Sequence, residues 1–129
     1  AGWLLGFSFC LWWSCWEGLV LLEICVYRCA AGRLPALLQR FETATLGFFA
    51  RHGFRPHGFF TTLVGQSHQE VTYMLLWESL AERERCWEAF HADPDWQAAR
   101  LASGQAAGGP LVVNASNQIL KPTGFSPLG

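Results

Sequence analysis

The run EVTYMLLW, from Glu70 to Trp77, constrains the fold more than any other part of this 129-residue chain. Its alternation in a period of two, with β-branched and aromatic residues, predicts a β-strand. One face of this strand would carry Val71, Tyr73, Leu75 and Trp77. The other face would carry Thr72, Met74 and Leu76. Because both faces are largely apolar, the sheet that contains this strand needs a cover on each side.

The segments around this strand predict one α+β domain. Strands are expected at residues 22–29, 57–65, 70–77 and 111–121, and helices at residues 33–52, 79–92 and 93–102. Ser79 and Glu82 have the spacing of a capping box, in which the Glu82 side chain returns to the Ser79 amide. Asp93 before Pro94 is typical of another helix start. Residues 103–110 are rich in Gly and Ala and predict a loop.

The resulting β-α-β-β-α-β order is that of a ferredoxin-like fold, in which the helices cover one face of the sheet. The other face would be apolar and open. We expect two chains to pair these faces as a homodimer, which closes a dimeric α/β barrel.

The net charge of the chain indicates which partners are not expected, and its cysteines indicate the cellular compartment. The formal net charge is −1 and no basic stripe is present, so nucleic acid is not an expected partner. The five cysteines show no CxxC motif, and no Cys/His cluster indicates a metal site. Cys25 and Cys29 would lie roughly 13 Å apart on one strand, too far for a disulfide. We therefore expect reduced thiols, no metal or cofactor, and a cytoplasmic location.

Residues 1–21 form an apolar, Trp-rich N-terminal extension. Glu17 is its only charged residue, and it contains four tryptophans. It lacks the basic residues of a signal peptide or a mitochondrial transit peptide. We interpret it as an extension without fixed structure, or one that lies before the native start. The alternatives are a membrane or interfacial anchor and a helix that packs on the domain at residues 22–129.

The first strand supplies the main candidates for a site. We assign Ile24 and Val26 to the helix-covered face, so that Glu23, Cys25 and Tyr27 would face the barrel interior. Burial there would raise the pKa of Glu23, which suits a general acid or base. Tyr27, with Tyr73 and Trp77 of the third strand, would then contact a ligand.

The competing interpretation of Glu23 is structural. It would form an ion pair with Arg28 or Arg55 that only holds the dimer together. His57, at the start of the second strand, is a weaker candidate for catalysis or ligand binding. His52, His68 and His91 are interpreted as a helix-end cation and two solvated side chains.

Several short runs resemble the NIPSNAP family. They are GFFTT (Gly58–Thr62), WESLAER (Trp77–Arg83), DPDWQ (Asp93–Gln97) and LKPTGFSP (Leu120–Pro127). Glu23, Tyr27 and Arg28 match the opening strand of that family. The resemblance covers residues 22–128, with His68 in place of an expected Asn in the hairpin turn. The single-domain form resembles the bacterial members rather than the tandem-domain animal ones.

This resemblance implies a dimeric α+β barrel and says little about activity. Animal members are associated with mitochondria, which makes a mitochondrial location the alternative. Two hypotheses of function remain open. In the first, the barrel binds a small apolar ligand, and a reaction such as cofactor-independent oxygenation is an analogy from the fold alone. In the second, the domain is a non-catalytic interaction or scaffold module.

Overall fold

The structure is a computed structural model and describes residues 21–127. Its sheet consists of β1 (Leu21–Cys29), β2 (Pro56–Thr61), β3 (Glu70–Trp77) and β4 (Val112–Leu120). The strands lie in the order β2-β3-β1-β4, and all neighbours are antiparallel. The ferredoxin-like α+β order predicted from the sequence is confirmed. The sheet is open at β2 and β4, so the described residues of one chain close no barrel.

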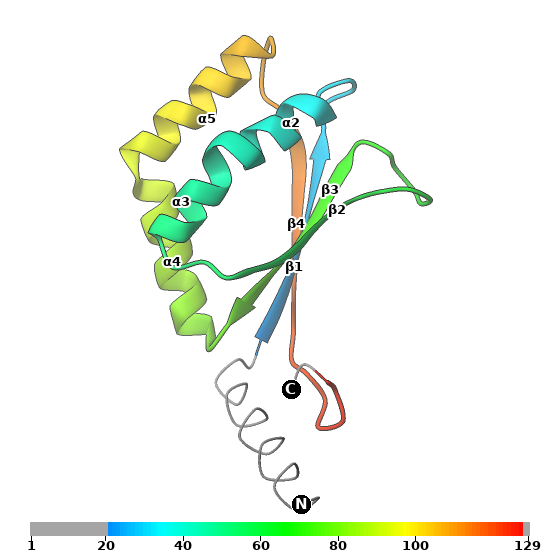
Figure 1. The fold of residues 1–129 in the computed structure, drawn as a ribbon, viewed down its shortest axis with the longest axis vertical. Coiled ribbons are helices and arrows are strands. Elements are labelled where there is room, and N and C mark those ends of the chain that lie inside the picture. Colours follow the sequence, from blue (N-terminus) through cyan, green and yellow to red (C-terminus); the bar gives the residue numbers. More distant parts are fainter. Residues whose placement is uncertain (1–20, 128–129) are drawn as a thin grey trace, which may run out of the picture.

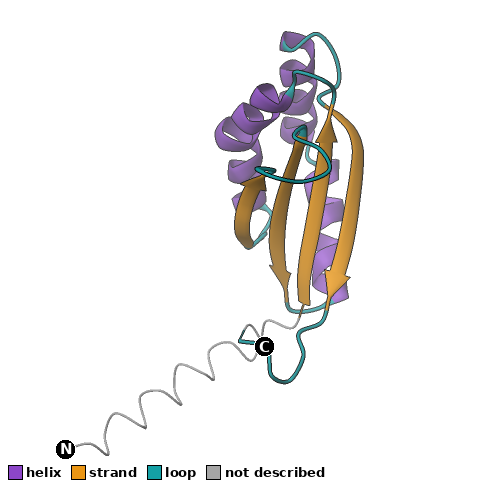
Figure 2. Ribbon diagram, turned by 90° about the vertical axis from the view of Figure 1, so that its right-hand side faces the viewer, coloured by secondary structure: helices purple, strands orange, loops and turns teal. Residues whose placement is uncertain are grey.

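The helices cover one face of the sheet, as Figures 1 and 2 show. The first helical segment is continuous and consists of α2 (Leu34–Arg40), the π-helical turn η1 (Phe41–Thr45) and α3 (Leu46–Arg51). Gly53 follows its cap residue His52 and has a φ of +79°, which is accessible to glycine at little cost. The chain returns after β3 through α4 (Leu80–Ala92) and α5 (Pro94–Ala106).

The corner between α4 and α5 is fixed by Asp93. Its carboxylate caps α5 by accepting a hydrogen bond from the Asp95 amide at 2.9 Å. It also lies 2.7 Å from His52 Nε2 and 3.0 Å from Arg51 Nη1, both at the end of α3. The His52 bond, helped by the cap and by Arg51, lowers the pKa of Asp93 to about 2 against the opposing effect of burial. The predicted helix start at Asp93 is confirmed, and it also ties α3 to the corner.

The strand register corrects the predicted orientation of β1. Glu23 pairs with Leu75 and Cys25 with Tyr73, so these residues share one face. That face is the helix-covered one, because Leu75, Tyr73, Cys25 and Glu23 are all fully buried. The assignment of Ile24 and Val26 to this face was therefore wrong. They lie on the open face and are half-buried.

An aromatic core joins the helices to the sheet. Phe49 of α3 stacks on Phe54 with ring centroids 4.4 Å apart. Phe54 in turn packs edge-on against Trp77 of β3 and Trp87 of α4. Phe90 completes the cluster, 5.2 Å from Phe49. Such large buried rings are the main source of hydrophobic stabilisation in a domain of this size.

Several predicted boundaries were wrong for local reasons. β2 ends at Thr61 rather than at residue 65, and the following exposed segment is irregular. α5 continues to Ala106, so the first half of the predicted loop at 103–110 is helix. Gly104 fits within α5 because a Cβ there would lie only 3.4 Å from the Gly109 carbonyl oxygen.

The predicted capping box is correct in one half only. Ser79 accepts a hydrogen bond from the Glu82 amide at 3.1 Å, as expected. The Glu82 carboxylate binds the Glu78 amide and Arg55 instead of the Ser79 amide. All alternatives for the N-terminal extension concern residues outside the described ones, apart from Leu21, the first residue of β1.

Candidate functional site

Glu23 lies at the centre of a buried hydrogen-bond network. Its Oε1 accepts from the indole nitrogens of Trp77 at 2.9 Å and Trp87 at 3.1 Å. Its Oε2 accepts from Arg83 Nη2 at 2.7 Å and from Asn117 Nδ2 at 2.8 Å. β3, α4 and β4 therefore converge on one carboxylate of β1. The network joins the sheet to the helical layer.

This environment keeps Glu23 ionised. Burial alone would raise its pKa, but the hydrogen bonds led by those from Arg83 and Trp87 hold the pKa below its ordinary value. The expected rise in the pKa of Glu23 was thus wrong. A carboxylate whose two oxygens are each occupied by two donors is poorly placed to accept another proton. The geometry favours the structural interpretation of Glu23.

The ion-pair partner of Glu23 differs from the predicted ones. Arg83 of α4 pairs with Glu23, whereas Arg28 pairs with Glu70 at 2.8 Å and Arg55 with Glu82 at 2.9 Å. Arg28 lies on the open face of the sheet with Ile24 and Val26, whereas Glu23 lies on the helix-covered face, so Arg28 does not reach Glu23.

The other sequence candidates do not meet at one place. Tyr73 and Trp77 are fully buried in the core. Tyr27 is half-buried, and its hydroxyl oxygen accepts a hydrogen bond from Tyr73 at 2.7 Å. Burial raises the pKa of Tyr27 to about 12, although the Tyr73 bond opposes this, so its phenol remains protonated and can donate. His57 is exposed on the edge strand β2.

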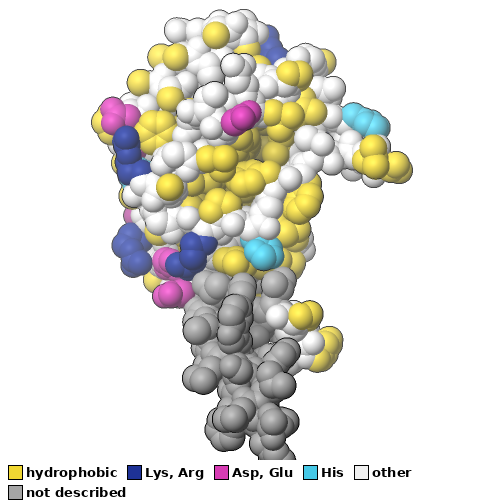
Figure 3. Space-filling view, viewed as in Figure 1, with side chains coloured by type: hydrophobic (Ala, Val, Ile, Leu, Met, Phe, Trp, Pro, Cys, Tyr) yellow, Lys and Arg dark blue, Asp and Glu magenta, His cyan; other side chains and the backbone are white. Residues whose placement is uncertain are grey.

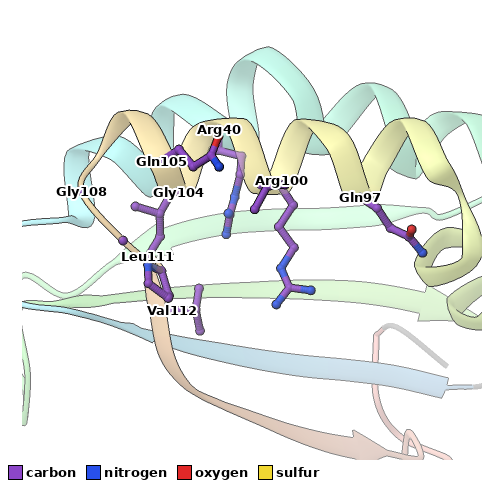
Figure 4. Close-up of a pocket in the computed structure, with 11 residues that line it drawn as sticks. Arg40, Gln97, Arg100, Gly104, Gln105, Gly108, Leu111 and Val112 are labelled. Atoms are coloured by element: carbon purple, nitrogen blue, oxygen red, sulfur yellow. The ribbon is translucent and has the colours of Figure 1, made fainter.

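Two adjoining cavities lie between the helices and the sheet, and Tyr27 lines one of them. The smaller has a volume of about 200 Å³ and is bounded by Tyr27, Phe41, Trp96, His91 and Ala115, among others. The larger, of about 770 Å³, lies between α5 and the start of β4 (Figure 4). Both are lined by Arg40, Arg100 and Val112. We call the two together the α5 cleft.

Arg40 is the unusual residue of the α5 cleft. It is 8% exposed, and its Nη1 donates a long hydrogen bond of 3.3 Å to Ser103 Oγ. Its guanidinium lies over the Trp96 ring, 5.8 Å from the centroid. Its Nε–H is buried and has no acceptor among the described residues. Unpaired buried charge costs several kcal/mol, so such a group usually has a partner.

Other arginines show how the rest of the domain avoids this cost. Arg55 and Arg83 also have a buried Nε–H without an acceptor, but each forms an ion pair with a glutamate. Within residues 21–127, no carboxylate forms an ion pair with Arg40 or Arg100. Burial and then the nearby Arg100 lower the pKa of Arg40.

The loop that borders the cleft is held by the Arg33 side chain. Arg33 donates to the carbonyl oxygens of Pro110 at 2.8 Å and Gly108 at 3.2 Å. Gly109 has a φ of +149°, and a Cβ there would lie 2.8 Å from the Arg33 guanidinium. Arg33 therefore fixes the loop between α5 and β4 that forms this rim of the cleft.

Sequence reasoning missed Arg40, Arg100 and the cleft. A signal was present, because Arg40 follows the buried Leu37 by three residues and Arg100 follows the buried Trp96 by four. These spacings place each arginine on the same helix face as a buried residue, with Arg40 itself buried and Arg100 exposed at the rim. His91 is exposed, as predicted, and it also lines the smaller cavity and stacks on Trp87 with ring centroids 5.3 Å apart. Burial and next Arg100 lower the pKa of His91.

The described cysteines agree with the predicted reduced state. Cys25, Cys29 and Cys86 are free and buried, whereas Cys10 and Cys15 lie outside the described residues. Among residues 21–127, no helix is long and apolar enough to cross a bilayer.

Comparison with known proteins identifies the family. The NIPSNAP family model matches residues 22–127. A NIPSNAP family protein of unknown function from Agrobacterium tumefaciens is 28% identical, with a TM-score of 0.75 over 88% of this chain and 96% of that chain. An uncharacterized NIPSNAP-like domain protein from Burkholderia xenovorans is 27% identical, with a TM-score of 0.74 over 86% and 91% of the two chains.

A more distant structure shares the fold alone. It is a monooxygenase from Streptomyces coelicolor in complex with nanaomycin D, 14% identical, with a TM-score of 0.57 over 84% of this chain and 91% of that chain. No curated protein matches the chain. The match of the family model over most of the sequence, which agrees with the bacterial structures, shows that this chain belongs to the NIPSNAP family.

Proposed function

We propose that this NIPSNAP domain binds a small, partly apolar molecule in the α5 cleft. The observation that carries the proposal is Arg40, a buried cation that faces a cavity and has no counter-charge from the described residues. Pockets for small molecules are mostly apolar and contain a few converging polar groups. The α5 cleft fits this description, because Arg40, Arg100 and the Tyr27 hydroxyl accompany aromatic and aliphatic walls.

The proposal is one of binding rather than of a reaction. Tyr27 is a neutral phenol, and Arg40 and Arg100 are donors without a basic lone pair. Glu23 is occupied by the protein itself. These groups suit recognition and orientation of a ligand better than proton transfer.

Native mass spectrometry of the full chain, purified gently from cells, tests the proposal. We expect extra non-covalent mass on the wild-type protein. The variant Ala115→Trp should lose it, since Ala115 lines the smaller cavity and a larger side chain would fill that space. Ala89→Trp, at an exposed position of α4, is the matched control and should retain the mass. Equal ligand occupancy in all three proteins would contradict a site in this cleft.

We further propose that the domain is a homodimer in the cytoplasm. The open face of the sheet carries half-buried apolar side chains of three central residues, Ile24, Val26 and Met74. An apolar sheet face of this kind favours pairing with a second copy. Sedimentation of Val26→Lys should show a lower molecular mass than the wild type at equal concentration. A monomeric wild-type chain would contradict this part of the proposal.

A scaffold function is the second candidate, and a specific feature supports it. The loop between β2 and β3 projects from the body in Figure 1, and Figure 3 shows hydrophobic side chains at its tip. Leu63 and Val64 in this loop are 88% and 92% exposed. Exposed apolar side chains of this kind can mark a protein contact. Retained cellular function of Ala115→Trp together with loss in Leu63→Ser would favour this candidate.

A further inference from the structure

We infer that the ligand of the α5 cleft carries an anionic group, a carboxylate or a phosphate, which Arg40 and Arg100 bind jointly from α2 and α5. The inference rests on the proposed function and specifies its ligand class.

The cleft is positively charged and lacks a compensating acid. Its ionisable lining residues are Arg40, Arg100, His91 and Tyr27, and none of the described lining residues is Asp or Glu. Arg40 and Arg100 are close enough for each to disfavour the charge of the other, which lowers the pKa of Arg40. An anion between them would remove both the repulsion and the missing counter-charge.

The donors that remain free point toward the same region. Figure 4 shows Arg40 and Arg100 both extending from their helices toward the sheet. Arg40 Nη2 and the Arg100 guanidinium form no hydrogen bond to another described residue. Tyr27 accepts from Tyr73, so its own hydroxyl proton is available to a third group. Guanidinium groups match the oxygen spacing of carboxylates and phosphates.

The local architecture sets Arg40 in place before a ligand arrives. The residue lies at the junction of α2 with the π-helical turn Phe41–Thr45, and π-helical turns are frequent at functional sites. Its guanidinium is confined by the Trp96 ring and by Ser103 of α5. A side chain already ordered in this way loses little entropy when it binds.

The walls indicate that the rest of the ligand is apolar. Leu101, Leu111, Val112 and Pro110 line the larger cavity next to the two arginines. A volume of about 770 Å³ there lies in the range of small-molecule pockets. The ligand class is therefore an organic anion with an apolar body.

The test compares three eight-carbon probes on the full wild-type chain by titration calorimetry. They are octyl phosphate, octanoate and the neutral 1-octanol. We expect at least one anionic probe to bind about tenfold or more tightly than 1-octanol, since a charged hydrogen bond contributes that much. Binding of only one anionic probe would identify its head group as the one recognised. Equal binding of all three probes would overturn the inference and leave the proposed function standing, whereas no binding of any probe would overturn both.

Two variants separate recognition from stability. Arg40→Met should lose about tenfold or more of the affinity for the anionic probe and leave 1-octanol unaffected. Its melting temperature without ligand should equal or exceed that of the wild type, because an unpaired buried charge has been replaced by an apolar chain of similar length. Arg100→Met, at an exposed position, should also weaken the anionic probe and fold normally. Arg85→Met, exposed on α4, is the control and should change nothing.

Unchanged affinity for the anionic probe in both Arg40→Met and Arg100→Met would show that the arginines do not recognise it. If Arg40→Met fails to fold, Arg100→Met alone decides between the two outcomes.

Discussion

Replacement of Glu23 by glutamine isolates the buried network that joins the sheet to the helices. The carboxamide keeps one acceptor oxygen and substitutes a donor for the other. In either orientation, two of the four donors from Trp77, Trp87, Arg83 and Asn117 would face an N–H group. Arg83 would also lose its only ion-pair partner among the described residues.

The expected loss can be worked out from the least damaging orientation. If the new amide nitrogen faces Arg83 and Asn117, both of these donors retain access to water, because the Arg83 side chain is 28% exposed and Asn117 lies on an edge strand. Each disrupted hydrogen bond then costs about 1–2 kcal/mol. Glu23→Gln should therefore lower the free energy of unfolding by about 3 kcal/mol, and the melting temperature by roughly 10 °C.

Urea unfolding followed by far-UV circular dichroism measures this change, with all proteins at the same concentration. The matched control is Glu70→Gln, which removes the carboxylate of the exposed pair with Arg28 and should cost about 1 kcal/mol or less. A loss below about 1 kcal/mol for Glu23→Gln would refute the structural interpretation of the network.

The same network predicts an acid-dependent stability. The pKa of Glu23 is lower in the folded chain than its ordinary value, so its contribution is complete above the unfolded pKa of about 4.3. It is lost as the pH falls through the folded pKa. The stability difference between wild type and Glu23→Gln should therefore shrink below about pH 4. A difference that is constant from pH 7 to pH 3 would contradict an ionised Glu23.

Three further predictions concern the corner, the core and the thiols. Asp93→Ala should lower the melting temperature more than Asp95→Ala, and the deficit of Asp93→Ala should diminish from about pH 4 toward the Asp93 pKa of about 2. Phe54→Ala should cost about 3–5 kcal/mol in urea unfolding, while Phe125→Ala, at a 90% exposed position, should be neutral. Burial raises the pKa of Cys25 to about 12, so iodoacetamide should leave this thiol unmodified in the native protein and alkylate it in urea, as peptide mass spectrometry would show.

The sequence contained the alternation of β1 but not the choice between its two faces. Ile24 and Val26 looked like the buried set, because a glutamate rarely lies under helices. The structure buries Glu23 instead, since four donors from three other elements converge on it. Those donors lie 54 to 94 residues away in the chain, beyond the reach of any local pattern.

The order of the elements was predictable because it depends on local signals. Asp93 with Pro94 marks a helix start by its own hydrogen bonding, and Gly53 marks a helix end by its positive φ. The α5 cleft is different in kind. It arises from the packing of α5 against β4, and its only local signal is that Arg40 and Arg100 share a helix face with the buried Leu37 and Trp96.

The most direct test of the central claim is to locate a bound probe by NMR. In a titration of the isotope-labelled full chain with octyl phosphate, we expect the largest shifts at the Arg40 Nε–H and at the amides of Arg100 and Val112, which line the α5 cleft. The amides of Ile24 and Met74, on the open face of the sheet, should shift little. Shifts concentrated on the open face, with none at Arg40, would contradict a ligand site between the helices and the sheet.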